Sequence, residues 1–212
     1  MGRTPVVDRG TALDAITRRF WAHGYEATSI DDLLGATGMH RGSFYRSFGD
    51  KRQAFMAALD NYVEVSRTDH VVPALEGRGS PVRRLMQLLY VRLDIALGLR
   101  AAAGVAPGDA DGPPGCLLVN TAVELAPHDA AAGTTVADAL GAMRGALAVL
   151  VDAAAELGEV PADVDRGPAV DQVFTVLQGV NVLARAGGDR RHLRGVLTGA
   201  VRTALRPTVP LP

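Results

Sequence analysis

Apolar residues recur every three or four positions along most of the chain, which is the spacing of one face of an α-helix. The first run, from about Asp8 or Thr11 to His23, places Ile16 and Phe20 on one stripe. Later runs are separated by glycine, proline or capping residues, the usual signals that start and stop helices. The pattern predicts helices over about 8–23, 29–37, 40–48, 51–67, 82–103, 115–126, 129–157, 168–186 and 189–206.

Three segments lack this periodicity. Residues 1–7 are expected to form a loose arm, as chain ends often do. Residues 72–81, which include Pro73 and Pro81, are expected to be a loop or a helix break. Residues 104–115 are rich in glycine and proline and are expected to be a flexible connection.

The composition also favours a helical fold. Hydrophobic residues make up 48% of the 212 residues and aromatic residues only 5%, so the apolar content is mostly Ala, Val and Leu. A chain of this length buries a substantial core. We therefore predict an all-α protein of about nine helices.

Residues 28–38 predict a short, well-capped helix. Ser29 is placed to cap it, and Asp32 three positions later completes a capping box. Thr28 with Asp31 offers the same box one residue earlier, so the sequence leaves two possible starts. Both starts place acidic residues in the first turn, where the helix dipole favours them.

A second short helix follows a turn at Gly38, where a positive φ lets a chain leave a helix sharply. Phe44 and Phe48 form its inward stripe. Two such helices joined by a glycine-bearing turn match the helix-turn-helix pattern, whose second helix enters the DNA major groove. From His40 to Arg52 the chain carries four cations and one carboxylate, although its net charge is −1. Such local positive charge suits phosphate contacts.

Two stretches carry a family resemblance: Gly-Tyr-Glu-Ala-Thr-Ser-Ile-Asp-Asp-Leu (24–33) and Gly-Met-His-Arg-Gly-Ser-Phe-Tyr-Arg-Ser-Phe-Gly-Asp-Lys (38–51). Together they resemble the signature of TetR-type transcriptional regulators, strongly over about residues 9–56. The resemblance implies a three-helix helix-turn-helix DNA-binding domain at residues 1–52 and a helical ligand-binding and dimerisation domain at residues 53–212. It further implies a repressor that leaves a palindromic operator when a small apolar effector binds.

The same resemblance assigns roles within the motif. Arg41, Ser43 and Arg46 are expected to reach base edges, and Gly42 to allow close approach to the duplex. Neighbouring hydroxyl groups and Lys51 would hold the DNA backbone. The expected DNA-binding residues are Thr28, Ser29, Thr37, His40, Arg41, Gly42, Ser43, Tyr45, Arg46 and Lys51.

Polar residues interrupt the apolar helices of the C-terminal half. An effector site needs a few polar groups in an apolar wall, so Asn120 is the first candidate to orient a ligand. Arg92, Glu124, Gln178 and Asn181 are weaker candidates, and any of these groups could instead lie at the solvent edge or in a dimer seam. The expected pocket residues are Leu89, Arg92, Leu93, Cys116, Asn120, Met143, Leu147, Phe174 and Gln178.

The last two predicted helices have long apolar stripes. An antiparallel pair of this kind supplies both an internal core and a self-complementary face, and two pairs form a four-helix bundle in a symmetric dimer. We therefore expect a homodimer. The expected interface residues are Val173, Leu177, Val180, Leu193, Val196, Leu197, Ala200 and Val201.

Other features narrow the class of protein. A net charge of −1 and a pI near 6.5 argue against a wholly basic nucleic-acid coat. The longest apolar run, 139–155, contains Arg144 and Asp152, and no targeting segment is recognisable, so no membrane partner is expected. One cysteine fits a reducing cytoplasm. The five histidines lack zinc-type spacing, so neither a metal nor a cofactor is expected.

Two alternatives remain at this point. Cys116 follows Gly115 near a predicted helix start, which would lower its pKa if it were exposed, so it is either a redox or electrophile sensor or a small buried hydrophobe. A helical enzyme or adaptor with a vestigial head is the other alternative. The sequence has no nucleophile elbow, dinucleotide-binding glycine motif or phosphate loop, so we expect no enzyme.

Overall fold

The computed structural model describes residues 8–100 and 113–212, and these two ranges contain α-helices, one π-helical turn and no strand. The all-α prediction is confirmed. The expected arm at residues 1–7 and most of the expected connection at 104–115 lie outside the described residues.

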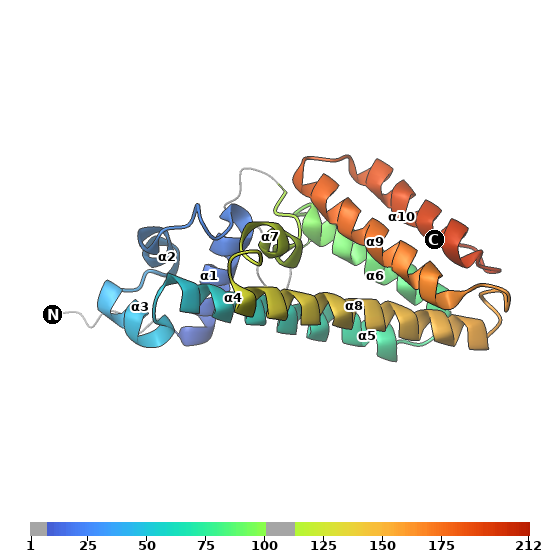
Figure 1. Ribbon diagram of the computed structural model, residues 1–212, viewed down its shortest axis with the longest axis horizontal. Helices are drawn as coiled ribbons and strands as arrows, with labels where there is room; N and C mark the ends of the chain where they lie inside the picture. Colours follow the sequence, from blue (N-terminus) through green and yellow to red (C-terminus); the bar gives the residue numbers. More distant parts are fainter. Residues whose placement is uncertain (1–7, 101–112) are drawn as a thin grey trace.

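Three helices form one end of the molecule (Figure 1). They are α1 (Arg9–His23), α2 (Ile30–Thr37) and α3 (Arg41–Phe48). Asp8 caps α1 by accepting a hydrogen bond of 3.0 Å from the Thr11 N–H. All three helices lie close to their predicted positions, because local caps and glycines set their ends.

A long helical segment leads away from these three helices, which form the head of the molecule. Helix α4 (Lys51–Ser66) continues through the π-helical turn Arg67–Val71 into α5 (Val72–Glu76). The expected break after Val72 is therefore wrong for the first five residues of that segment. The π turn shifts the backbone register just before Pro73, where an α-helical hydrogen bond cannot form because proline has no N–H.

The remaining helices form the body, which lies beside and beyond α4 (Figure 1). They are α6 (Pro81–Ala96), α7 (Leu117–Glu124), α8 (Ala130–Glu156), α9 (Arg166–Arg185) and α10 (Arg190–Leu205). Helix α6 ends earlier than the predicted 103, because Gly98 takes a φ of 74° and turns the chain. Residues 101–103 of that prediction lie outside the described residues.

Two clusters of buried apolar side chains hold these helices together. One cluster joins α6, α8, α9 and α10, and its fully buried members include Leu147 and Leu197. The other joins α1 to α4 with α7 and the start of α8, and it includes Trp21 and Leu117. The core of the head is therefore continuous with part of the body, so α7 packs where it can affect both.

Among the described helices, α8 is the one whose length and hydropathy would suit a membrane span. This is weak support for a membrane role, because core helices of water-soluble proteins meet the same criteria. Arg144 of α8 forms an ion pair with Asp171, and Asp152 forms one with Arg166, so α8 is joined to α9 by charges. Such charges are costly within a bilayer.

Candidate DNA-binding and effector sites

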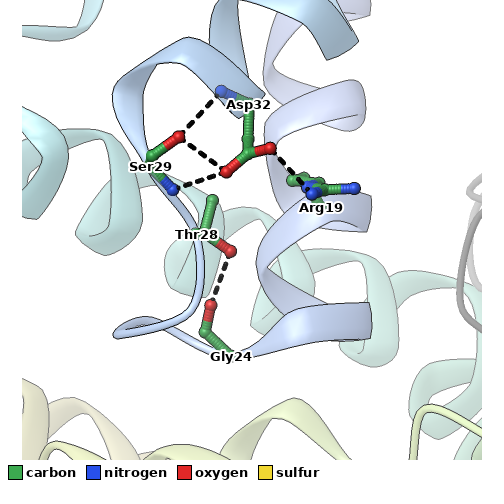
Figure 2. Close-up of polar contacts among 5 residues, drawn as sticks. All are labelled: Arg19, Gly24, Thr28, Ser29 and Asp32. Atoms are coloured by element: carbon green, nitrogen blue, oxygen red, sulfur yellow. Dashed lines mark hydrogen bonds and ion pairs between the residues drawn. The ribbon is translucent and has the colours of Figure 1, made fainter.

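The helix-turn-helix begins at a capping box at the N-terminus of α2 (Figure 2). Ser29 Oγ accepts a hydrogen bond of 3.1 Å from the Asp32 N–H, and the Asp32 carboxylate accepts one of 2.8 Å from the Ser29 N–H. Arg19 of α1 donates to the same carboxylate at 2.9 Å. The bonds from Ser29, aided by the charge of Arg19, lower the pKa of Asp32. The predicted capping box is present and joins α2 to α1.

Two of the expected DNA contacts belong to this framework instead. Thr28 Oγ1 is buried and donates to the Gly24 carbonyl at 2.7 Å (Figure 2). Thr37 is also buried, and its hydroxyl donates to the Leu33 carbonyl at 2.8 Å. Their assignment as DNA-binding residues is corrected, because buried hydroxyls bonded to carbonyls cannot reach a phosphate. Ser29 remains exposed, although its hydroxyl takes part in the cap.

Helix α3 presents one face to the core and the other to solvent. Gly38 ends α2 in the left-handed conformation, with φ 66°, and this sets the direction of α3. Phe44 and Phe48 are buried with ring centroids 5.6 Å apart. A Cβ on Gly42 would meet no atom within 4 Å, so the surface above it is open. The exposed or half-exposed residues on this face are His40, Arg41, Gly42, Ser43, Tyr45 and Arg46.

Two cations of the predicted set have partners within the chain. Arg41 forms an ion pair with Asp31 of α2, and both side chains are largely exposed. Lys51 Nζ lies 4.3 Å from the centroid of the Tyr25 ring and donates to the Glu26 carbonyl at 3.4 Å. A surface ion pair is weak and easily exchanged for a phosphate, so Arg41 remains available to DNA.

Arg52, the cation that follows Lys51, pairs with Asp129 at the start of α8 through bonds of 2.5 and 2.8 Å. These bonds lower the pKa of Asp129 to about 2. Arg52 therefore joins the head to the body.

A pocket opens among α4, the π turn, α6, α7, α8 and α9. It encloses a cavity of about 90 Å³. This is less than the roughly 300–1,000 Å³ of common ligand sites, so it suits a small ligand unless the pocket widens. The lining residues are Val63, Ser66, Arg67, Val71, Arg92, Cys116, Leu118, Ala139, Leu140, Ala142, Met143, Leu177, Gln178 and Asn181.

The pocket brings together four of the nine expected ligand residues, namely Arg92, Cys116, Met143 and Gln178. The other five lie elsewhere. Asn120 donates to the Pro114 carbonyl at 3.0 Å, and Phe174 packs at the edge of the body core. The remaining three are buried in that core and do not line this pocket: Leu89, Leu93 and Leu147.

The sequence did not point to the α4 side of this pocket. Ser66 and Tyr62 lie one turn apart, so they share a face of α4, and both accept hydrogen bonds from Arg92. The polar group at each of these two positions is the sequence signal that could have indicated this side of the pocket. Burial raises the pKa of the Tyr62 hydroxyl, which therefore stays protonated.

The position of Cys116 does not favour the sensor hypothesis. The residue is 2% exposed, and its Sγ lies 3.7 Å from Tyr62 Oη and 3.6 Å from an Arg92 nitrogen. It is also the single cysteine of the sequence, so no second thiol of the same chain can resolve an oxidised sulfur.

Six of the eight expected dimer residues are buried inside one chain. They pack in the core between α9, α10 and α6, so they cannot form the surface that meets a second copy. The corrected residues are Val173, Leu177, Val180, Leu193, Leu197 and Val201. Val196 and Ala200 keep partial exposure. Leu177 also lines the pocket.

A different face of the same two helices is open to solvent. Val182 and Leu183 of α9 are 53% and 49% exposed. On α10, Gly195 and Gly199 are exposed, and a Cβ at either position would meet no atom within 4 Å. These four exposed positions carry either an apolar side chain or none.

Metal-ligating side chains do not gather in the described part of the chain: no group of three or more His, Cys, Asp or Glu residues there is placed to hold an ion.

Comparison with protein families gives two matches. Residues 12–58 match the model described as bacterial regulatory proteins, tetR family, and residues 99–200 match the tetracyclin repressor-like C-terminal domain. The first range covers α1 from Ala12, α2, α3 and the first half of α4, and the second covers α7, α8, α9 and most of α10.

Individual relatives agree with these matches. The chain is 27% identical over 201 residues to the HTH-type transcriptional repressor ComR of Escherichia coli (strain K12), covering 95% of this chain and 90% of that protein. It is 32% identical over 129 residues to the uncharacterized HTH-type transcriptional regulator YezE of Bacillus subtilis (strain 168), covering 61% and 60%. A cysteine mutant of the TetR family transcriptional regulator CifR, solved with 26-bp double-strand operator DNA, is 26% identical with a TM-score of 0.78, covering 96% and 100%.

Proposed function

This chain belongs to the TetR family of DNA-binding transcriptional regulators, and from that premise we propose that it represses transcription by binding a palindromic operator as a homodimer. The observation that carries this proposal is the exposed face of α3, which shows Arg41 and Arg46 to solvent while Phe44 and Phe48 anchor it. Dimeric helix-turn-helix proteins place two such helices about 34–36 Å apart, one turn of DNA.

We assign base contacts to Arg41, Ser43 and Arg46, with Gly42 allowing close approach. Backbone contacts fall to Ser29, Lys51 and Tyr45, which border the same face. His40, at the cap position before α3, is also exposed. The division into a DNA-binding domain of residues 1–52 and an effector and dimerisation domain of residues 53–212 is part of this proposal.

We place the homodimer contact on the open face of α9 and α10, including Val182, Leu183, Gly195 and Gly199. Two copies of this helix pair would form a four-helix bundle about a two-fold axis. The partners are thus operator DNA, a second copy of the chain and a small effector, with no membrane. Operator DNA places the protein in the cytoplasm.

We place the effector in the pocket beside α4. This helix begins in the head and reaches the pocket at Val63 and Ser66, so a ligand that shifts it changes the spacing of the two recognition helices. The ligand releases DNA only to the extent that it binds the second conformation more tightly.

The test is sequence-selective binding by the full chain. Fluorescence polarisation with inverted repeats from the DNA flanking its own gene should identify an operator that a scrambled duplex does not match. Arg41→Ala and Tyr45→Ala should each weaken that binding at least about tenfold, the effect of losing about 1.4 kcal/mol. Arg83→Ala is the matched control, because Arg83 is an exposed arginine on α6. Unchanged operator binding in both head variants would contradict the assignment.

A further inference from the structure

Among the residues that the structure describes, one buried cation of the pocket has no anionic partner. Arg92 is 4% exposed, and its guanidinium donates to Ser66 Oγ at 2.8 Å, to Tyr62 Oη at 3.3 Å and to Cys116 Sγ at 3.6 Å. These acceptors are hydroxyl and thiol groups. Among residues 8–100 and 113–212, Arg92 forms no ion pair. Burying a charge without a counter-charge costs several kcal/mol, so such a group is usually functional.

The three bonds also leave part of the guanidinium unused. An arginine side chain has five N–H donors arranged in a planar fork that fits a carboxylate with two parallel bonds. Ser66, Tyr62 and Cys116 accept three of these bonds. Both Nη2 donors are used, by Tyr62 and Cys116, so a carboxylate that takes two parallel bonds must replace at least one of them.

A second polar group in the pocket is also incomplete. Asn181 is 3% exposed, and its Oδ1 has no hydrogen-bond donor among the described residues. Its Nδ2 donates to Gln178 Oε1 at 3.4 Å. Buried amide oxygens almost always have a partner, so this acceptor calls for an N–H or O–H group that the described part of the chain does not supply.

The rest of the pocket sets the size and charge of its ligand. Most lining residues are apolar, and none of them is Asp or Glu. Arg67 lies at the rim with its side chain 57% exposed and pairs with Glu64. The positive charge of Arg92 also contributes, after burial, to lowering the pKa of the nearby His70. One fully buried cation in an apolar cavity of about 90 Å³ matches a single negative charge on a small apolar body.

We infer that the effector is a small monocarboxylic acid, with its carboxylate on Arg92, its apolar part against Leu140 and Met143, and a donor group directed to Asn181. This inference rests on the proposed effector-responsive function. A phosphate dianion fits less well, because a single buried arginine cannot balance two charges. The carboxylate would compete with Ser66 and Tyr62 for the guanidinium and so loosen the attachment of α4 to α6.

The first test compares acids with matched amides on the wild-type full chain. Isothermal titration calorimetry at pH 7 would use four acids that also carry a hydroxyl donor, namely lactate, 3-hydroxybutanoate, 6-hydroxyhexanoate and 4-hydroxybenzoate, each beside its primary amide. The acids should bind about ten- to a hundredfold more tightly than the amides, the range expected for hydrogen bonds to a charged group. Equal or tighter binding of the amides would overturn the inference.

The second test changes the cation. Arg92→Gln should weaken acid binding at least about tenfold and leave amide binding unchanged, whereas Arg67→Gln at the rim should have a much smaller effect. Circular dichroism checks the folding of each variant. If Arg92→Gln does not fold, the comparison of acids with amides on the wild type still decides the question.

Operator binding separates the two proposals. A wild-type chain that binds its operator but none of the four acids overturns the carboxylate inference and leaves the regulator intact. A chain that binds the acids but no operator overturns the proposed function instead. Release of the operator by an acid, but not by its amide, supports both.

Discussion

The carboxylate of Glu124 on α7 accepts a hydrogen bond of 3.0 Å from the backbone N–H of Tyr25, in the loop between α1 and α2. Its other oxygen accepts one of 2.9 Å from the Glu26 N–H. Gly115 lies just before α7 in the chain, and its carbonyl accepts a hydrogen bond of 3.0 Å from the Trp21 indole of α1. Helix α7 is thus joined to the DNA-binding head near both of its ends, and Cys116, at its start, lines the proposed effector pocket.

Loss of the Glu124 contacts should loosen the head. Glu124→Gln keeps one acceptor and should lower the free energy of unfolding by about 1 kcal/mol, whereas Glu124→Ala removes both and should cost about 2 kcal/mol. Urea denaturation measures both values. Glu156→Gln, an exposed change at the end of α8, is the control. An equal effect of all three substitutions would show that these bonds contribute nothing specific.

Removal of the Asp31 carboxylate should strengthen operator binding. In the free protein Asp31 forms an ion pair with Arg41. In the complex its negative charge would lie near the DNA phosphates. Asp31→Asn should therefore raise operator affinity about two- to tenfold at low salt, with a smaller gain at high salt. Polarisation titrations at several salt concentrations measure this, with Asp138→Asn on the exposed side of α8 as the control. Weaker binding by Asp31→Asn would mean that Arg41 needs this partner for its orientation.

The Arg52–Asp129 pair should make part of the stability depend on acid pH. The pKa of Asp129 is lowered to about 2 in the folded chain, while an unfolded aspartate titrates near about 3.9. The stabilisation is therefore complete above about pH 4 and is lost as the pH falls toward about 2. Asp129→Asn keeps a helix-capping side chain and removes this titration.

Wild type should be the more stable of the two at pH 6, and the difference should disappear in that acid range. Thermal unfolding followed by circular dichroism between pH 2 and pH 6 measures it. A stability difference that stays constant across this range would contradict the assignment of the lowered pKa to this pair.

A charge on the open face of α9 should prevent self-association. Val182→Arg places a cation at the centre of the proposed dimer contact, where it would be buried without a partner. Sedimentation should then show a monomer with an unchanged circular dichroism spectrum. Val149→Arg on α8 is a matched control, because Val149 is 55% exposed and Val182 is 53% exposed. Dimers that persist in Val182→Arg would exclude this face.

The sequence by itself determined the helices and the helix-turn-helix. Ser29 and Asp32 form the predicted capping box, and Gly38 ends α2 as expected, while Asp129 and Asp189 cap α8 and α10. These features depend on bonds between residues within four positions of one another, so a linear pattern contains them. Pro73 is the exception, because a neighbouring π turn accommodated it within the helix.

Tertiary structure alone decided which side of each stripe faces the core, and which distant groups meet. Leu197 and Val201 have the same periodicity whether they pack inside one chain or between two, so their burial in the body was not readable from spacing. The pairing of Arg52 with Asp129, 77 positions away, and the enclosure of Arg92 by α4 and α7 depend on how whole helices dock. Such contacts are fixed by packing across the fold, which residue type and local spacing do not encode.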